Sequence, residues 1–590
     1  MEQEDQPLED ATWVARQKVS IDELTFAAGV LWWLQNSPSG GKTQLMRSSG
    51  AEAPVPVTPP GLAIGGWLHG YGGGSYAVGD DGVVWFIDGT DSGLRRLNPE
   101  SGHVEAVTGE GGFLFGDLSP APGGVLAVRG CDGGDELVLC HAGESSVQVL
   151  LRSAGFLGAP RLLGDHLAVL EWDEDQMPWD GSRLLVSRLV SDGVPESPKV
   201  IAGGVEESVV QPMWGPDGEL YYLSDRSGWW NLYRWDGVRH RAVAPMDFDC
   251  APAPWEAGYQ SFAFLADGRI ALTVQDGLSH RLVIAAADGT VRDVDVPLTS
   301  IKPYVAAHAH WVAVIGSASA EPPAVVDVNV DANVAPASSP AVVSAKPAAV
   351  AGEHRRVPGR GQLRFLMHRP SVDEPVPLII RAHAGPTDEV RDRLDWTKQY
   401  FVAHGFAVAE VVYRGSAGLG RAFRTCLNGN WGTFDVEDCL AVARHLVSEG
   451  LAVPGAVFLS GSSAGGYTAL QAACVQDSPL AAVTAISAIV DPVGWATTAP
   501  RFQRAHARTL AGPAGAVRAE KVRIPVLLMH GRGDQVATVA DAEALAGELS
   551  IRDRRHEALF FDDVGHYLSK PEVLAQALRA ELAFYRRFTD

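Results

Sequence analysis

Hydrophobic residues follow two different patterns along the chain, and the pattern changes near residue 330. Before that point, short apolar runs alternate with Gly, Asp and Pro turns, as in residues 81–87, 216–222 and 266–272. An Asp-Gly pair between apolar runs is a strong hairpin signal, because glycine adopts the positive φ that such turns need. Hairpin units that recur at about 40–50 residues are typical of propeller blades. About seven such units lie between Leu24 and Val330, which predicts a seven-bladed β-propeller; a pair of β-sandwiches is the alternative.

The second pattern follows a stretch rich in Ala, Pro, Ser and Val at 331–351, which we interpret as a linker. Apolar strands then alternate with helical stretches. The expected strands are 377–380, 407–412, 456–459 and 525–529, and the clearest helices are 435–448 and 464–474. Such alternation predicts a doubly wound, mostly parallel sheet with helices on both faces, as in the α/β-hydrolase fold.

These patterns divide the chain into three expected parts. Residues 1–23 form an N-terminal segment, and we expect its residues 11–21 to form a short helix that packs on the hydrolase domain. Residues 24–340 form the propeller, and 341–590 form the α/β-hydrolase domain.

The charge and the cysteines narrow the class of protein. A net charge of −23 disfavours nucleic acid and anionic membranes as partners. Residues 1–10 are acidic and resemble no secretory signal, and no apolar run is long enough to cross a membrane. Six scattered cysteines without metal-ligand spacing indicate reduced thiols. We therefore expect a cytoplasmic protein without a metal or another cofactor; a homo-oligomer stays open.

A nucleophile elbow is the strongest chemical signal in the sequence. Residues 461–465 read Gly-Ser-Ser-Ala-Gly, a G-x-S-x-G motif that is weak by itself. Here a buried strand precedes it and a helix follows, which is the context in which this turn lifts a serine hydroxyl above the sheet. The third position, Ser463, is the predicted nucleophile, and Ser462 is its neighbour.

The acid and the base follow in the chain order of α/β-hydrolases. Asp534 comes after the strand 525–529, and His566 comes after the strand 558–561. Both therefore lie on loops at the carboxyl ends of strands, where such sites form. Asp562 and Asp563 are alternative acids on the loop of the base itself, and His530 is expected to have a structural role.

An oxyanion site needs two preorganised donors. The backbone N–H of Ala464, directly after the nucleophile, is the first candidate. The hydroxyl of Tyr413, after the strand 407–412, is the second; a tyrosine that only packs is the alternative. The loop His383-Ala384-Gly385-Pro386 is expected to be structural.

Taken together, these motifs resemble the prolyl oligopeptidase family of serine peptidases over nearly the whole chain. The residues that carry the resemblance are 383–386, 413–420, 431–432 with Asp435 and Asp438, 461–467, 531–534 and 565–566. The resemblance implies that Tyr413 of the Tyr-Arg-Gly-Ser motif donates to the oxyanion. In the first half, 71–74, 177–180 and 224–233 are similar to the bacterial branch of acylaminoacyl-peptidases and dipeptidyl-aminopeptidases.

Two stretches bear on the substrate. Dipeptidyl peptidases of this family hold the free amine of the substrate with a Glu pair from the propeller, and Glu206 and Glu207 match that idea. A solvated acidic pair is the alternative. Residues 502–506 read Phe-Gln-Arg-Ala-His, where relatives carry a pattern like Phe-Glu-x-Arg-Tyr. This departure favours a small-molecule amide over an ordinary peptide.

We therefore expect a serine peptidase that cleaves small peptides or aminoacyl amides and recognises their free amine. One alternative is an amide or ester hydrolase dedicated to an antibiotic-like aminoacyl substrate. The other is a binding protein that works through its propeller and keeps a relic hydrolase; the intact triad argues against it.

Overall fold

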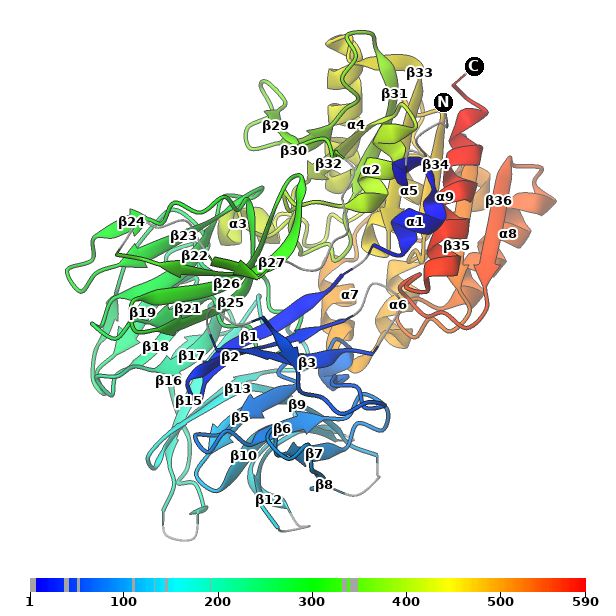
Figure 1. Ribbon diagram of the computed structural model, residues 1–590. Coiled ribbons are helices and arrows are strands. Elements are labelled where there is room, and N and C mark those ends of the chain that lie inside the picture. The colour runs from blue at the N-terminus through cyan, green and yellow to red at the C-terminus, as the bar shows by residue number, and fades with distance from the viewer. Residues whose placement is uncertain are drawn as a thin grey trace.

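The computed structural model describes residues 7–17, 19–36, 42–49, 53–108, 112–131, 133–143, 147–190, 193–331, 337–339 and 348–589. Two domains are stacked on each other, with the all-β part below and the α/β part above in Figure 1. Among the described residues, no helix is long and apolar enough to span a membrane.

The first domain is a ring of seven four-stranded antiparallel sheets within the described residues. In blade order, the strands are β1 (Ile21–Ala27), β2 (Val30–Gln35), β3 (Gln44–Ser48) and β4 (Val55–Pro56); β5 (Tyr76–Val78), β6 (Val84–Ile87), β7 (Leu94–Leu97) and β8 (Val104–Ala106); β9 (Leu114–Ala121), β10 (Gly124–Cys131), β11 (Gly134–His141) and β12 (Val147–Ser153); β13 (Phe156–Leu163), β14 (His166–Trp172), β15 (Ser182–Arg188) and β16 (Lys199–Gly204); β17 (Val209–Trp214), β18 (Leu220–Ser224), β19 (Asn231–Trp235) and β20 (His240–Ala242); β21 (Phe262–Phe264), β22 (Ile270–Gln275), β23 (His280–Ala285) and β24 (Val291–Asp293); and β25 (Ser300–His308), β26 (Trp311–Ala318), β27 (Glu321–Asn329) and β28 (Ala337–Ser339). The predicted seven-bladed propeller is confirmed.

Apolar side chains between neighbouring blades hold the ring together. The ring closes between the last blade and the first, where Trp33 of β2 shares a buried cluster with Tyr304 of β25 and Ile315 of β26. Lys302 of β25 also forms an ion pair with Asp22 of β1 across this junction. Closure therefore depends on apolar packing and one charge pair.

The second domain contains an eight-stranded sheet in the order β29-β30-β32-β31-β33-β34-β35-β36. Its strands are β29 (Glu353–Arg356), β30 (Arg364–His368), β31 (Val376–Ala382), β32 (Ala407–Val412), β33 (Ala452–Ser462), β34 (Ala482–Ile486), β35 (Val526–Gly531) and β36 (His556–Phe561). The pairs β29–β30 and β30–β32 are antiparallel, and all the others are parallel. The predicted α/β-hydrolase sheet is confirmed.

Helices cover both faces of this sheet. Within the described residues, the helices are α1 (Ala11–Ala15), α2 (Trp396–Ala403), α3 (Gly420–Thr425), α4 (Phe434–Ser448), α5 (Ala464–Ala472), α6 (Pro492–Thr498), α7 (Arg504–Leu510), α8 (Val539–Ile551) and α9 (Pro571–Arg586), with 3₁₀ turns at Pro7–Glu9, Leu68–Gly70, Arg501–Gln503 and Ala519–Lys521. One buried cluster joins the sheet to α4, α5 and α8, and another joins the opposite face to α1, α2 and α9.

The N-terminal segment packs on the face of the sheet that α2 and α9 also cover. Ala11 and Val14 of α1 lie in the same buried cluster as Phe401 of α2 and Leu578 of α9. Trp13 also meets Trp396 edge to face, with ring centroids 5.3 Å apart. The chain then crosses to the propeller, where β1 begins at Ile21. The expected domain limits at 23 and 340 stay predictions, and most of the expected linker at 331–351 lies outside the described residues.

Candidate active site

The nucleophile elbow lies between β33 and α5. Ser463 is the N-cap of α5 and has φ 54° and ψ −116°, a backbone conformation that residues other than glycine rarely adopt. The flanking glycines make the turn sterically feasible: a Cβ on Gly461 would lie 2.0 Å from the carbonyl oxygen of Gly465, and one on Gly465 would lie 2.1 Å from that of Ala382. The local sequence therefore fixes Ser463 at the carboxyl edge of the sheet.

The acid and the base meet because their strands are parallel neighbours. β35 leads into the loop of Asp534, and β36 leads into the loop of His566. His566 Nδ1 lies 2.8 Å from Asp534 Oδ2. The other oxygen, Oδ1, accepts the backbone N–H groups of Val536 at 2.8 Å and Ala537 at 2.9 Å. Both carboxylate oxygens thus have fixed partners.

His530 supports this carboxylate from within β35. Its Nε2 lies 3.0 Å from Asp534 Oδ2 and 2.9 Å from the Ala537 carbonyl oxygen, so this nitrogen carries the proton. Burial would raise the pKa of Asp534, but the hydrogen bonds from His530 and His566 outweigh it and hold that pKa well below its usual range. Asp534 is therefore a carboxylate that keeps the proton of His566 on Nδ1 and leaves Nε2 free to accept one.

The alternative acids Asp562 and Asp563 are both exposed. The Asp562 side chain is 83% exposed and lies 3.2 Å from Arg532. Among the described residues that surround His566, the recorded carboxylate partner is Asp534. The roles of Ser463, Asp534 and His566 as a catalytic set stay predictions.

The two expected oxyanion donors differ in their surroundings. Ala464 is the first residue of α5, where backbone N–H groups have no partner inside the helix. Tyr413 is fully buried; its ring stacks on His383 with centroids 4.1 Å apart, and its hydroxyl donates to the His383 carbonyl oxygen at 2.8 Å. Because Tyr413 holds this loop in the present conformation, its donation to an oxyanion stays a prediction.

The loop 383–386 lies directly against the elbow. A Cβ on Gly465 would meet the carbonyl oxygens of Ala382 and His383. The imidazole of His383 lies 2.8 Å from the Ala384 carbonyl oxygen and 2.7 Å from Ser416 Oγ. The loop therefore forms a wall beside Ser463, and the structural role expected from its sequence stays a prediction.

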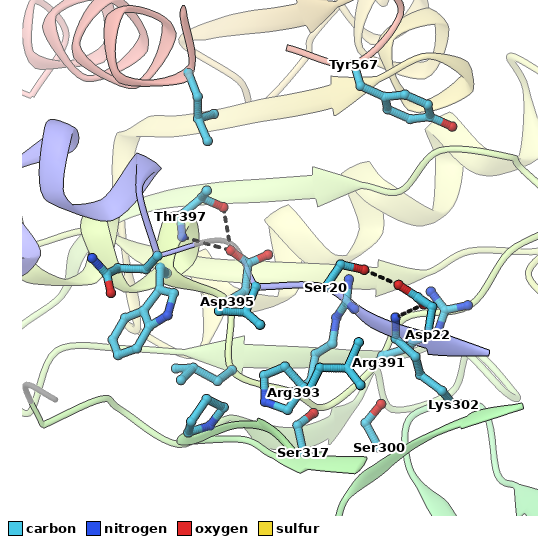
Figure 2. Close-up of a pocket in the computed structure, with 18 of the residues that line it drawn as sticks. Ser20, Asp22, Ser300, Lys302, Ser317, Arg391, Arg393, Asp395, Thr397 and Tyr567 are labelled. Carbon is cyan, nitrogen blue, oxygen red and sulfur yellow. Dashed lines mark hydrogen bonds and ion pairs between the residues drawn. The ribbon is translucent and has the colours of Figure 1, made fainter. Parts of the chain in front are cut away.

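A cavity of about 590 Å³ lies between the two domains. It is lined by Ser462, His566 and Tyr567 of the hydrolase, by Glu256 and Lys302 of the propeller, and by the N-terminal strand that carries Asp22. Figure 2 shows Asp22 and Lys302 side by side with Arg391 near them, while Tyr567 lies across the cavity. His566 therefore faces a space that residues of both domains line.

Residues 501–506 form the seam between the hydrolase and the propeller. Phe502 is buried among aromatic rings of the propeller, which are His69, Tyr71, Phe156, Trp172 and Trp179. Gln503 donates to the hydroxyl of Tyr71, and the ring of His506 lies edge to face with Trp179 at 5.2 Å and Trp255 at 5.5 Å. Burial lowers the pKa of His506 to about 3, so this side chain is neutral.

The predicted amine-binding pair is placed less favourably for its role. Glu207 lies 2.7 Å from Arg226 and accepts the Ser224 hydroxyl at 2.6 Å. Glu206 is exposed. Neither residue lines the cavity that contains His566. Amine binding by this pair stays a prediction. Among the described residues, no group of three or more His, Cys, Asp and Glu side chains is arranged to hold a metal ion.

A nucleophile elbow and an acid–histidine pair at the carboxyl edge of this sheet define the class of the domain, a serine hydrolase with the α/β-hydrolase fold. Comparison with known proteins agrees with the family that the motifs indicated. Residues 392–590 match the model described as "Prolyl oligopeptidase family". The resemblance inferred from the motifs is confirmed.

Curated relatives match the same domain. A dipeptidyl aminopeptidase BIII from Pseudoxanthomonas mexicana is 27% identical over 34% of this chain and 31% of its own length. The human acylamino-acid-releasing enzyme is 26% identical over 34% of this chain and 29% of its own length. The match therefore spans about a third of these relatives.

Solved structures match both domains. A Mycobacterium tuberculosis puromycin-hydrolyzing peptidase is 27% identical, with a TM-score of 0.91 over 98% of this chain and 96% of that one. A mutant puromycin hydrolase complexed with PGG is also 27% identical over the same shares, with a TM-score of 0.92. An acylaminoacyl peptidase from Pyrococcus horikoshii, at 14% identity and a TM-score of 0.74, shares the fold.

Proposed function

We propose that the protein is a serine aminopeptidase or amidase that removes an aminoacyl group from small peptides or aminoacyl amides. The observation that carries this proposal is the Asp534–His566 pair, whose histidine lines a cavity between the domains together with Ser462, the neighbour of Ser463. A cavity of this size accommodates a small substrate, and the propeller keeps folded proteins away from the nucleophile.

In the proposed mechanism, His566 Nε2 takes the proton of the Ser463 hydroxyl as Oγ attacks the acyl carbon. Asp534 holds the other imidazole proton and stabilises the imidazolium that forms. The Ala464 N–H, at the start of α5, donates to the developing oxyanion, and Tyr413 is the proposed second donor. His566 then protonates the leaving amine, and water attacks the acyl-enzyme to regenerate the serine.

The likeness to two puromycin-hydrolysing enzymes along nearly the whole chain supports an aminoacyl amide as the substrate class. The curated dipeptidyl aminopeptidase and acylamino-acid-releasing enzymes support hydrolysis at the N-terminal end of peptides. A small antibiotic-like aminoacyl amide therefore remains the second candidate. All six cysteines are free thiols, which supports the predicted reducing, cytoplasmic location.

The test compares puromycin with aminoacyl-, N-acetylaminoacyl- and dipeptidyl-nitroanilides. Wild-type protein is expected to cleave the aminoacyl substrates, whereas Ser463→Ala loses both hydrolysis and fluorophosphonate labelling. Ser462→Ala is the matched control and is expected to retain labelling. Labelling that persists in Ser463→Ala would falsify the assignment of Ser463 as the nucleophile. A wild-type enzyme that prefers dipeptidyl or N-acetyl substrates would contradict the proposed preference for aminoacyl substrates.

A further inference from the structure

Tyr567 is an exposed aromatic side chain in the central cavity. Among the described residues, the exposed aromatic side chains are Trp67, Phe113 and Tyr567, and of these only Tyr567 lines the cavity that contains His566. Tyr567 is 57% exposed, and Figure 2 shows its ring across the cavity from Asp22. A large apolar ring is therefore left uncovered at the proposed active site.

The position of Tyr567 beside His566 indicates which part of a substrate would cover it. Tyr567 follows His566 directly, and the two rings meet edge to face with centroids 5.4 Å apart. His566 Nδ1 is bound to Asp534, which leaves Nε2 to carry the proton of Ser463 to the leaving nitrogen as the C–N bond breaks. That nitrogen must lie within hydrogen-bond reach of His566. A group attached to it therefore comes close to Tyr567, whereas the acyl group stays on Ser463.

Tyr71 of the propeller is a second aromatic side chain near Tyr567. It lines an adjoining cavity of about 190 Å³, which shares Asp22 with the first. Burial raises the pKa of Tyr71 well above its usual value, and Tyr567 adds to that rise, so the two phenols lie close to each other. The Tyr71 hydroxyl accepts from Gln503, and its ring meets Trp255 edge to face at 5.2 Å. Tyr71 is therefore held in place beside the uncovered ring.

An exposed phenol face beside a second, fixed phenol favours a planar ligand. Aromatic rings attract each other in offset-stacked and edge-to-face arrangements, and a flat ring contacts Tyr567 over its whole face, whereas a puckered ring touches it with fewer atoms. We propose that Tyr567 binds the leaving group of the substrate and that this group is a planar aromatic amine. The inference rests on the proposed function and narrows its substrate class to aminoacyl arylamides.

Steady-state kinetics test the proposal with alanyl-anilide and alanyl-cyclohexylamide, whose leaving groups are similar in size but differ in planarity. Tyr567→Leu is expected to lower kcat/KM for the anilide about 10–100-fold and for the cyclohexylamide less than about threefold, because only the flat ring loses a stacking partner. Tyr567→Phe keeps the ring and is expected to retain the wild-type value. Phe113→Leu, exposed on the propeller outside this cavity, is the matched control.

Deacylation separates a leaving-group site from damage to His566. The leaving group has departed before water attacks the acyl-enzyme. The deacylation rate measured with the nitrophenyl ester of alanine is therefore expected to change less than about twofold in Tyr567→Leu. A fall in deacylation by the same factor as in anilide hydrolysis would show that Tyr567 only supports His566, and would overturn the proposal.

Binding separates this inference from the proposed function. Calorimetry with alanyl-anilide on Ser463→Ala protein is expected to show binding that weakens about 10-fold or more when Tyr567→Leu is added, whether or not wild-type protein hydrolyses the anilide. Absent hydrolysis with Tyr567-dependent binding would reject only the proposed function. Unchanged binding, or equal losses for the anilide and the cyclohexylamide, would overturn the role of Tyr567.

Discussion

Replacing Asp225 by alanine is expected to weaken the docking of the propeller on the hydrolase. This carboxylate belongs to the propeller, and its side chain is completely buried. Its Oδ2 accepts from Arg421 and Arg424 of α3, each at 2.7 Å, and its Oδ1 accepts the Ser208 N–H at 2.8 Å. The Arg424 side chain is 1% exposed and stacks on Trp230 at 3.9 Å. One buried carboxylate thus pairs with two arginines from the other domain.

The magnitude follows from what the substitution leaves behind. Removing one partner of a buried ion pair typically costs about 3–5 kcal/mol, because the remaining charge is buried without compensation. We expect Asp225→Ala to lower the free energy of unfolding by about this amount. If the stranded charge is the cause, the double variant Asp225→Ala/Arg424→Met should be more stable than Asp225→Ala alone.

The assay is urea unfolding followed by tryptophan fluorescence, with Asp236→Ala as the control. Asp236 pairs with Arg241 on the propeller surface, at 3.2 Å and with both side chains partly exposed, and such pairs contribute about 1 kcal/mol or less. The reasoning is refuted if Asp225→Ala costs no more than Asp236→Ala, or if adding Arg424→Met makes the protein less stable still.

Three further predictions concern the elbow, the seam and acid stability. Gly465→Ala places a Cβ 2.1 Å from the Ala382 carbonyl oxygen, which displaces the elbow. We therefore expect kcat/KM to fall about 100-fold, while a cooperative melting transition shows that the protein is still folded. A kcat/KM close to that of the wild type would contradict this prediction. Phe502→Ala should cost about 3–5 kcal/mol of unfolding free energy because it empties a buried aromatic site, and a loss below 1 kcal/mol would contradict it. Burial opposes ionisation of Glu389, but Arg391 and His280 together outweigh it and lower its pKa from 4.5 to about 2. A depressed pKa adds stability above pH 4.5 that is lost as the pH falls toward 2, so Glu389→Gln should flatten this part of the stability–pH curve, and an unchanged slope would refute the pairing.

Local signals in the sequence were sufficient to predict much of the fold. The Asp-Gly turns place Gly82, Gly218 and Gly268 between paired strands, each with a positive φ of 76–84°. The elbow motif and the order of the strand ends likewise predicted that Asp534 lies beside His566, and their side chains are in contact. These predictions succeed because a turn or a strand end is determined by a few neighbouring residues.

Contacts between the domains could not be predicted in this way. Nothing in residues 502–506 indicates that Phe502 packs beside Tyr71 and Trp179, since those partners are hundreds of positions away and meet it only when the domains dock.

The placement of α1 has a mechanical consequence. The chain starts on the hydrolase, crosses to build the whole propeller, and returns, so that both ends lie on the same domain. The propeller is therefore joined to the hydrolase by two chain crossings and not by a single linker. The contact of Trp13 with Trp396 keeps the first of these attachments in place on the hydrolase, so the start of the chain limits how far the propeller can shift on its partner domain.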